Sequence, residues 1–314
     1  MKILVTGGAG FIGSHLVDRL LKEGHEVVCI DNFILGSIKN LSHALNHQSF
    51  KLYDQDLLKL DEIDLIFQKE KIELIYHLAA NSDVKEGSIS IDRDFNLTFL
   101  TTFNVLTCMK KHKINKIVFT STPAIFGNYS GPLREDVRPN PESLYGASKL
   151  SSEFFIKTFS NLYGIQCWII RLSNIVGERS THGVIHDFFV KIGKNKEELN
   201  VLGDGQQSKP YMYVHEIVDA IQFIFSNSNE MINHYNVGPK DFTKVSEIAN
   251  ILLEETGEQR EIIYSGGKRG WKGDVPFYYY DAIKLRNLGW EPKYKSTQAV
   301  RKAIISIIEE ASDV

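Results

Sequence analysis

Cysteine and long apolar runs are both scarce in this chain of 314 residues. Cys29, Cys108 and Cys167 are widely spaced and each lies in an apolar run, which is typical of buried thiols in a reducing compartment and excludes a disulfide framework. No stretch approaches the roughly 18 apolar residues of a membrane span, and the apolar run 3–5 is too short for a signal peptide. We therefore expect a cytoplasmic protein without a membrane partner.

An excess of charge of one sign is also missing. The 36 basic and 39 acidic side chains leave a net charge of -3, which gives no electrostatic footprint for nucleic acid. Only 23 glycines and 8 prolines are present, and no linker rich in them divides the chain. What remains is a globular composition, 43% hydrophobic and 24% charged, long enough for one large domain or two closely packed ones.

Short β-branched runs alternate with amphipathic stretches through the first 172 residues. We expect strands at 3–5, 26–30, 51–53, 73–78, 116–120 and 167–172, and helices at 12–22, 61–69, 94–111 and 145–163. The strand segments are apolar throughout, with no alternation of polar residues, because both faces of such a sheet are covered by helices. The pattern predicts an α/β fold built on a doubly wound parallel sheet.

The rhythm changes after about residue 172, where loops lengthen and glycine and asparagine cluster. Residues 211–214 and 235–237 are predicted strands that return to the first sheet, and 245–254 and 297–309 are predicted helices. We therefore expect two lobes that share interleaved segments. The predicted division is a first domain of residues 1–172 with returning segments at about 211–238, and a smaller C-terminal lobe of residues 173–210 and 239–314.

A glycine-rich segment, GGAGFIG at residues 7–13, lies between the first strand and the first helix. Glycines there permit a tight turn and let the backbone approach a pyrophosphate at the helix N-terminus. Asp31 ends the next strand, where a carboxylate accepts hydrogen bonds from the adenosine ribose, although it could also be an ordinary helix N-cap. A carboxylate repels a 2′-phosphate and no arginine follows at Asn32 or Phe33, so the segment favours NAD over NADP.

Tyr145 and Lys149 form a Y-x-x-x-K pair, which places a phenol and an ammonium on one helix face. A free tyrosine has a pKa of about 10, too high for a general base at neutral pH. A nearby ammonium and a positive nicotinamide ring would draw that pKa down. The pair is uninformative alone, but Thr122 supplies a hydroxyl at the carboxyl end of a parallel strand, where ligands bind.

These motifs together resemble the extended short-chain dehydrogenase/reductase superfamily, in its nucleotide-sugar epimerase/dehydratase branch. The resemblance covers nearly the whole chain and rests on TGGAGFIGSHLVDRL at 6–20, HLAA at 77–80, STPAIFG at 121–127, YGASK at 145–149, RLSNIVGER at 171–179, LGDGQQSKPYMYV at 202–214 and RGWKGDVP at 269–276. It implies a Rossmann-type sheet, NAD as cofactor and a nucleoside-diphosphate sugar as substrate.

The resemblance also implies roles for individual residues. Tyr145 would be the acid/base, Lys149 would orient the ribose and lower the tyrosine pKa, and Thr122 would take the place usually held by Ser or Thr. The expected cofactor contacts are Gly7, Gly10, Phe11, Ile12, Asp31, Asn32, Asp56, Leu57, Leu78, Ala79, Ala80, Tyr145 and Lys149. For Asp56 the alternative is a cap on the following helix. The expected substrate contacts are Asn174, Lys209 and Arg269, with Lys272 as the alternative to Arg269, and residues 180–205 would line the sugar pocket.

Several positions depart from the pattern of that branch. Lys209 and Pro210 stand where an Arg-Asp pair is usual, which keeps a positive charge and loses the bidentate fork of arginine. Dehydratases of the branch carry Asp-Glu just after the catalytic threonine, where this chain has Pro123 and Ala124. The acid and base for water elimination are therefore missing, as is the glutamate that decarboxylating relatives use.

Two other patterns suggest sites or partners. His43 and His47 are four residues apart, but no third ligand accompanies them, so we predict no metal site. Two predicted helices carry more aromatic residues than one buried face needs, namely Phe95, Phe99, Phe103 and Leu106 on one and Phe154, Phe155, Phe159 and Leu162 on the other. These faces are either core or the four-helix interface of a homodimer, which we expect. His77 is expected to pack beside the cofactor.

The favoured function is C4 epimerisation of a nucleoside-diphosphate sugar through a transient 4-keto intermediate. The alternative is a nucleotide-sugar 4-dehydrogenase, for a hexose or heptose, that releases the keto sugar. A non-catalytic NAD-binding protein is the third hypothesis, since fold alone does not guarantee activity. Intact Thr122, Tyr145 and Lys149 argue against it.

Overall fold

A seven-stranded parallel sheet forms the centre of the computed structural model, which describes residues 1–312 except 84–86, 88–89, 269 and 271–274. The strand order is β11-β6-β5-β4-β1-β2-β3. The strands are β1 (Lys2–Thr6), β2 (Glu26–Asp31), β3 (Phe50–Asp54), β4 (Leu74–His77), β5 (Lys116–Ser121), β6 (Gln166–Leu172) and β11 (Ile232–Val237). All six pairings are parallel, so the predicted Rossmann-type doubly wound sheet is confirmed.

Helices cover both faces of this sheet. α1 (Phe11–Lys22) and α8 (Val214–Asn227) pack on one face, while α2 (Leu60–Glu70), α5 (Thr101–His112) and α6 (Leu144–Tyr163) pack on the other. Because side chains alternate along a strand, Ile3 and Val5 of β1 enter one core and Leu4 enters the opposite one. The three cysteines are buried free thiols, as expected.

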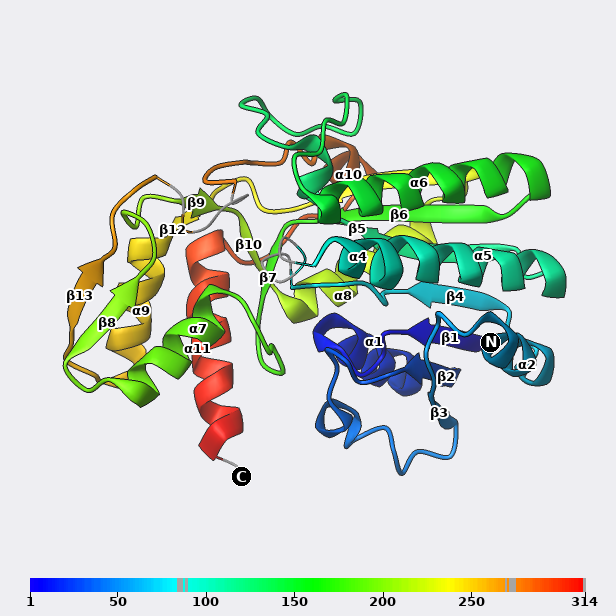
Figure 1. The fold of residues 1–314 in the computed structure, drawn as a ribbon, viewed down its shortest axis with the longest axis horizontal. Coiled ribbons are helices and arrows are strands. Elements are labelled where there is room, and N and C mark those ends of the chain that lie inside the picture. The colour runs from blue at the N-terminus through cyan, green and yellow to red at the C-terminus, as the bar shows by residue number, and fades with distance from the viewer. Residues whose placement is uncertain (84–86, 88–89, 269, 271–274, 313–314) are drawn as a thin grey trace.

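A smaller group of elements lies beside the sheet, on the left of Figure 1. It contains the two-stranded sheets β7 (Asn174–Val176) with β10 (Tyr211–Tyr213), β8 (Glu198–Val201) with β13 (Glu261–Tyr264), and β9 (Ser208–Lys209) with β12 (Thr243–Lys244). Its helices are α7 (Val184–Lys194), α9 (Val245–Thr256) and α11 (Ser296–Ser312). A separate core joins them, including Phe188, Leu252 and Val300. The predicted smaller C-terminal lobe is thus present.

Two predicted elements differ from the structure. Residues 211–214 were expected in the first sheet, but β10 pairs with β7 and α8 begins at Val214, so that expectation is wrong. The chain leaves the large sheet at Ser173, one residue after β6. β7 therefore lies outside that sheet, and β10 lies outside it too because it pairs with β7. The helix expected at 94–111 is three consecutive segments, α4 (Ile91–Asp94), the π-helical η2 (Phe95–Leu100) and α5.

The remaining short elements are η1 (Ile38–Leu41), η3 (Pro123–Phe126) and α10 (Ile283–Leu288). Within the described ranges, no helix has both the length and the apolar character that crossing a bilayer requires.

Candidate active site

A cavity of about 360 Å³ lies at the carboxyl ends of the central strands. Most residues predicted from the sequence line it, namely Gly7, Gly10, Phe11, Ile12, Asp31, Asn32, Asp56, Leu57, Leu78, Ala79, Ala80, Thr122, Tyr145, Lys149 and Asn174. Lys209 lies on β9 beside Thr243 and is not among the described residues of the lining. Arg269 and Lys272 lie outside the described residues.

The glycine-rich turn forms one wall of the cavity. Gly7 has a φ of +71°, and a Cβ there would lie 2.7 Å from the backbone nitrogen of Ala79. A Cβ on Gly13 would overlap the carbonyl oxygen of Gly7. Both positions therefore require glycine, because the turn is tight and the start of α1 packs directly against it. This cradle leaves the N-terminus of α1 open to an anionic group.

Asp31 ends β2 and is buried at the edge of the cavity. One carboxylate oxygen, Oδ2, accepts a hydrogen bond from the backbone N–H of Ala9 at 2.9 Å, and Oδ1 accepts one from Phe33, also at 2.9 Å. Burial raises the pKa of Asp31, although these hydrogen bonds oppose the shift. Asp31 is not a helix N-cap, because neither Ala9 nor Phe33 belongs to a helix. Its two hydrogen bonds instead fix the glycine-rich turn and the loop after β2 relative to each other.

Asp56 follows β3 and also does not cap the next helix. Its Oδ1 accepts a hydrogen bond from the backbone N–H of Leu58 at 2.9 Å, whereas Lys59 occupies the N-cap position of α2. The alternative of a helix cap is therefore excluded for Asp56. Its carboxylate remains in the lining of the cavity, near the end that Asp31 borders.

The structure brings Thr122, Tyr145 and Lys149 together at the other end of the cavity. Thr122 follows β5, and its hydroxyl accepts a hydrogen bond from the backbone N–H of Ala124 at 3.2 Å. Tyr145 and Lys149 lie on the first turns of α6, and the side chain of Thr122 lies close enough to the Tyr145 hydroxyl to lower its pKa. The Nζ atom of Lys149 donates to the carbonyl oxygen of Thr120 at 2.8 Å. Strand β5 thus positions both the hydroxyl and the ammonium.

Burial shifts the pKa values of Tyr145 and Lys149 in opposite directions. It raises the pKa of Tyr145 to about 12, against the hydrogen bond from Thr122, and it lowers the pKa of Lys149 to about 7. In the chain alone the phenol is protonated at neutral pH: burial and the charge of Asp94 raise its pKa, and the expected lowering by Lys149 is not among the causes of the shift. A positive nicotinamide ring bound in the cavity would add charge that favours the phenolate.

A buried ion pair lies one turn beyond Lys149 and was not anticipated from the sequence. Glu153 on α6 accepts hydrogen bonds from Nε of Arg171 at 3.0 Å and from Nη2 at 2.8 Å. The side chains are 1% and 3% exposed, so almost no water screens them. Burial favours the neutral carboxyl, but the guanidinium holds the pKa of Glu153 below its ordinary value. The pair joins α6 to β6 one turn beyond Lys149.

Other polar residues of the lining were also missed, namely Asn81, Ser82, Ser121 and Ser173. Of the segment 180–205, which was expected to line the sugar pocket, Thr181 and His182 do so. Asn174 accepts a hydrogen bond from the hydroxyl of Tyr278 at 2.7 Å. His77 packs beside the site as expected, with Nδ1 at 2.7 Å from the Thr6 hydroxyl.

A sequence model of the NAD dependent epimerase/dehydratase family matches residues 3–238. The chain belongs to this family. The UDP-glucose 4-epimerase of Mycolicibacterium smegmatis is 30% identical over 311 residues, which cover 97% of each chain. A structure of the UDP-glucose 4-epimerase of Thermotoga maritima with UDP-glucose superposes with a TM-score of 0.90, at 30% identity, over 99% of this chain and 100% of that one. The UDP-glucose 4-epimerase of Thermus thermophilus in complex with NAD gives a TM-score of 0.88 at 28% identity, over 98% of this chain and 99% of that one.

Membership of the NAD dependent epimerase/dehydratase family establishes NAD as the cofactor and nucleotide-sugar epimerase/dehydratase chemistry as the class of reaction. The residues of this chain fit NAD. Gly7 and Gly13 form a cradle that any larger side chain would fill, and the N-terminus of α1 faces this cradle, as a pyrophosphate requires. Asp31 lies at the end of β2, where a carboxylate would accept hydrogen bonds from the adenosine ribose. The family name covers both epimerases and dehydratases, so the individual reaction depends on the sugar end of the cavity.

Proposed function

We propose that this enzyme inverts C4 of a nucleoside-diphosphate sugar through a 4-keto intermediate. The observation that carries the proposal is the composition of the sugar end of the cavity. Thr122 and Tyr145 both line that end, and the positions after Thr122 are Pro123 and Ala124, which cannot transfer protons. Among the described residues of the lining, the carboxylates are Asp31 and Asp56, which follow β2 and β3 at the opposite end. This supports epimerisation over dehydration, since elimination of water needs a further acid and base.

In the proposed reaction Tyr145 removes the proton of the sugar 4-hydroxyl while Thr122 hydrogen-bonds the same oxygen. Bound NAD supplies a hydride acceptor that later returns the hydride. Lys149 would hold the cofactor ribose, and its position on α6 is fixed by its hydrogen bond to Thr120. The cavity retains the keto sugar while it turns its other face, and Tyr145 then returns the proton to the oxygen. No additional acid or base is needed.

UDP-glucose is the first substrate to test, because relatives of this chain are described as UDP-glucose 4-epimerases. The purified protein, without added NAD, would be mixed with UDP-, GDP-, CDP- and dTDP-sugars. Products would be identified by NMR while the absorbance of reduced nicotinamide is followed. Appearance of a C4 epimer without net reduced cofactor supports the proposal. Stoichiometric reduced cofactor with a released keto sugar would identify a 4-dehydrogenase instead, and silence across the panel would contradict both.

We expect Asp31→Asn to weaken NAD binding by about tenfold or more, because a hydrogen bond to a charged acceptor contributes about 1.5–3 kcal/mol. The amide also directs its NH₂ group at the backbone N–H of Ala9 or Phe33, both of which now donate to the carboxylate. Calorimetric titration of cofactor-free protein with NAD and with NADP measures the two dissociation constants. The ratio of the NADP constant to the NAD constant should be smaller in Asp31→Asn than in the wild type. Asp61→Asn, on the first turn of α2, is the control and should bind NAD normally.

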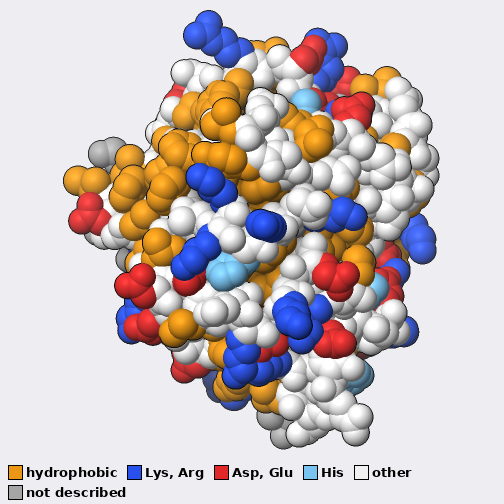
Figure 2. Space-filling model, turned by 90° about the vertical axis from the view of Figure 1, so that its right-hand side faces the viewer, with side chains coloured by type: hydrophobic (Ala, Val, Ile, Leu, Met, Phe, Trp, Pro, Cys, Tyr) orange, Lys and Arg blue, Asp and Glu red, His pale blue; other side chains and the backbone are white. Residues whose placement is uncertain are grey.

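We further propose that the enzyme is a homodimer joined through η2, α5 and α6. Phe99 contacts Phe155 with ring centroids 5.0 Å apart, and hydrophobic residues beside this pair are exposed, including Phe154 (56%) and Leu162 (65%). Figure 2 shows hydrophobic side chains gathered at the upper left, over the part of the molecule that carries α5 and α6. A contiguous apolar patch of this kind marks an interface.

Leu162→Asp should convert the dimer to a monomer, because the carboxylate would be buried without a partner in the interface. Sedimentation equilibrium measures the molecular mass directly. Leu65→Asp is the matched control, since Leu65 is 64% exposed and belongs to α2, which is not part of the proposed interface. A wild-type monomer, or an equal effect of both substitutions, would contradict the proposed interface.

A further inference from the structure

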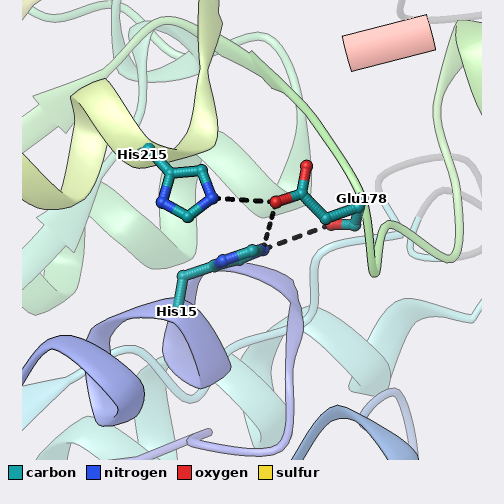
Figure 3. A group of neighbouring side chains, drawn as sticks. All are labelled: His15, Glu178 and His215. Carbon is teal, nitrogen blue, oxygen red and sulfur yellow. Dashed lines mark hydrogen bonds and ion pairs between the residues drawn. The ribbon is translucent and has the colours of Figure 1, made fainter. Parts of the chain in front are cut away.

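Three side chains from distant parts of the chain meet outside the cavity. His15 lies on α1, Glu178 lies in the loop between β7 and α7, and His215 lies in the first turn of α8 (Figure 3). One nitrogen of each histidine and one oxygen of the glutamate all lie within 4.8 Å of one another. None of the three lines the cavity described above, so the proposed reaction does not account for them.

Dashed lines in Figure 3 run from both imidazoles to the same carboxylate oxygen, and a further line joins Nε2 of His15 to the backbone carbonyl oxygen of Glu178 at 3.3 Å. Nε2 of His215 is 2.8 Å from Oε1 of Glu178, and Nε2 of His15 is 3.9 Å from that atom. Around a tetrahedral ion with bonds of about 2.0–2.2 Å, ligand atoms are about 3.4 Å apart. The two observed distances bracket this value. Small side-chain rotations would therefore bring the three atoms into one coordination sphere.

The neighbours of Glu178 orient it for this arrangement. The hydroxyl of Tyr213 donates to the other carboxylate oxygen, Oε2, at 3.0 Å, and that hydroxyl lies 3.1 Å from Oγ of Ser306 on α11. Oε1 is thereby left facing the two histidines. Metal-binding carboxylates are commonly held by such a second hydrogen bond.

The exposure of the three side chains decreases from the surface inward. The side chain of His215 is 57% exposed, that of Glu178 is 16% exposed and that of His15 is 3% exposed. An ion can therefore reach the cluster from the His215 side. The same side leaves room for water as a fourth ligand.

The positive side chain beside the cluster is paired with an acid. Arg179 is the nearby positive group, and its Nη1 is paired with Asp18 of α1 at 2.8 Å. The backbone N–H of Arg179 donates to Glu310 of α11 at 3.3 Å. Asp18 thus offsets part of the charge of the guanidinium, and Arg179 makes no ion pair with Glu178 among the described contacts.

We propose that His15, Glu178 and His215 bind one divalent transition-metal ion of the zinc class. Two imidazole nitrogens and one carboxylate oxygen form a donor set that Zn²⁺ accepts, whereas Ca²⁺ and Mg²⁺ require mainly oxygen ligands. The ion would connect α1, which begins at the glycine-rich turn, to the loop after β7 and to α8. Its role is structural, joining the large sheet to the smaller group of elements.

The test uses untagged full-length protein that has been treated with a chelator and then titrated with Zn²⁺ against a chromophoric competitor. We expect one Zn²⁺ per chain. Glu178→Gln and His215→Gln should each weaken binding by about tenfold or more, and Tyr213→Phe by about tenfold, the range found for residues that orient a ligand. The matched control is the double variant His43→Gln/His47→Gln, which removes two exposed histidines four residues apart and should bind as tightly as wild type.

Two further readouts separate a built site from loss of folding. Co²⁺ bound to the wild type should show the visible absorption of a low-coordinate N/O site, which His215→Gln should lack. Zn²⁺ should raise the melting temperature of the wild type and of the control, but not of His215→Gln, because the ion binds only the native state. His215 is exposed, so its replacement leaves the core intact. Absence of stoichiometric binding, or unchanged affinity in His215→Gln, would overturn the proposal.

Discussion

Replacing Tyr145 with phenylalanine should lower kcat for the sugar substrate by about a thousandfold, within the range that a positioned acid/base contributes. The substitution removes one oxygen and leaves the ring in place. Thr122 cannot take over, because its hydroxyl already accepts the backbone N–H of Ala124 and has an even higher intrinsic pKa than a phenol. The affinity for NAD should be unchanged, since Gly7, Gly13 and Asp31 are untouched.

Single-turnover experiments with the identified substrate measure the chemical step, and the NAD content after gel filtration measures cofactor retention. Tyr264→Phe is a suitable control because it removes the hydroxyl of a tyrosine that is 40% exposed on β13. That variant should turn over normally. Normal turnover in Tyr145→Phe would exclude the proposed mechanism, and loss of NAD in that variant would mean that the residue has a binding role.

Residues close in sequence account for most of what could be predicted. The segment 7–13 and the Tyr145–Lys149 pair each form one local structure, so their spacing alone specifies their geometry. Asp31 was predictable because parallel strands end at the same edge of a sheet. The apolar segment at 211–213 is recognisable as a strand, but its partner is not, because YMY fits either sheet equally well.

Local patterns also mislead in places. α7 was not anticipated because Gly183 and Gly193 border or interrupt its amphipathic sequence, and both are typical of loops. In η2 the aromatic residues Phe95 and Phe99 keep a spacing of four, which is compatible with an ordinary α-helix. The extra backbone residue of a π-helical turn leaves no signature in such a pattern.

Contacts between residues far apart in the chain could not be predicted from the sequence. His43 and His47 stand out in the sequence because they are four residues apart. Both are exposed, and within the part of the chain that the structure describes they belong to no group of metal-ligating side chains. His15, Glu178 and His215 lie on three segments that only the fold brings together. Arg171 did offer a signal, since a lone charge in an apolar strand needs a partner. Which acid would supply that partner depends on how α6 packs on β6.

Glu153→Gln should lower the free energy of unfolding by about 3 kcal/mol or more, since removal of one member of a buried ion pair leaves the other charge uncompensated. Arg171 is 3% exposed and donates two hydrogen bonds to this carboxylate, so an amide can accept only part of them and carries no charge. The negative charge of Glu153 also raises the pKa of Lys149. Its removal should therefore lower the pKa of Lys149 further.

Urea unfolding of the two proteins measures the loss of stability. Glu23→Gln is the control, because Glu23 pairs with Arg19 at the surface and exposed pairs contribute about 1 kcal/mol or less. The double variant Glu153→Leu/Arg171→Leu should be more stable than Glu153→Gln, since it removes both buried charges and leaves neither of them uncompensated. A wild-type urea midpoint for Glu153→Gln would show that the ion pair does not hold α6 against β6. The position of Tyr145 and Lys149 would then depend on the capping of α6 by Ser143, on the Thr120 carbonyl and on the burial of Ile156 in the core.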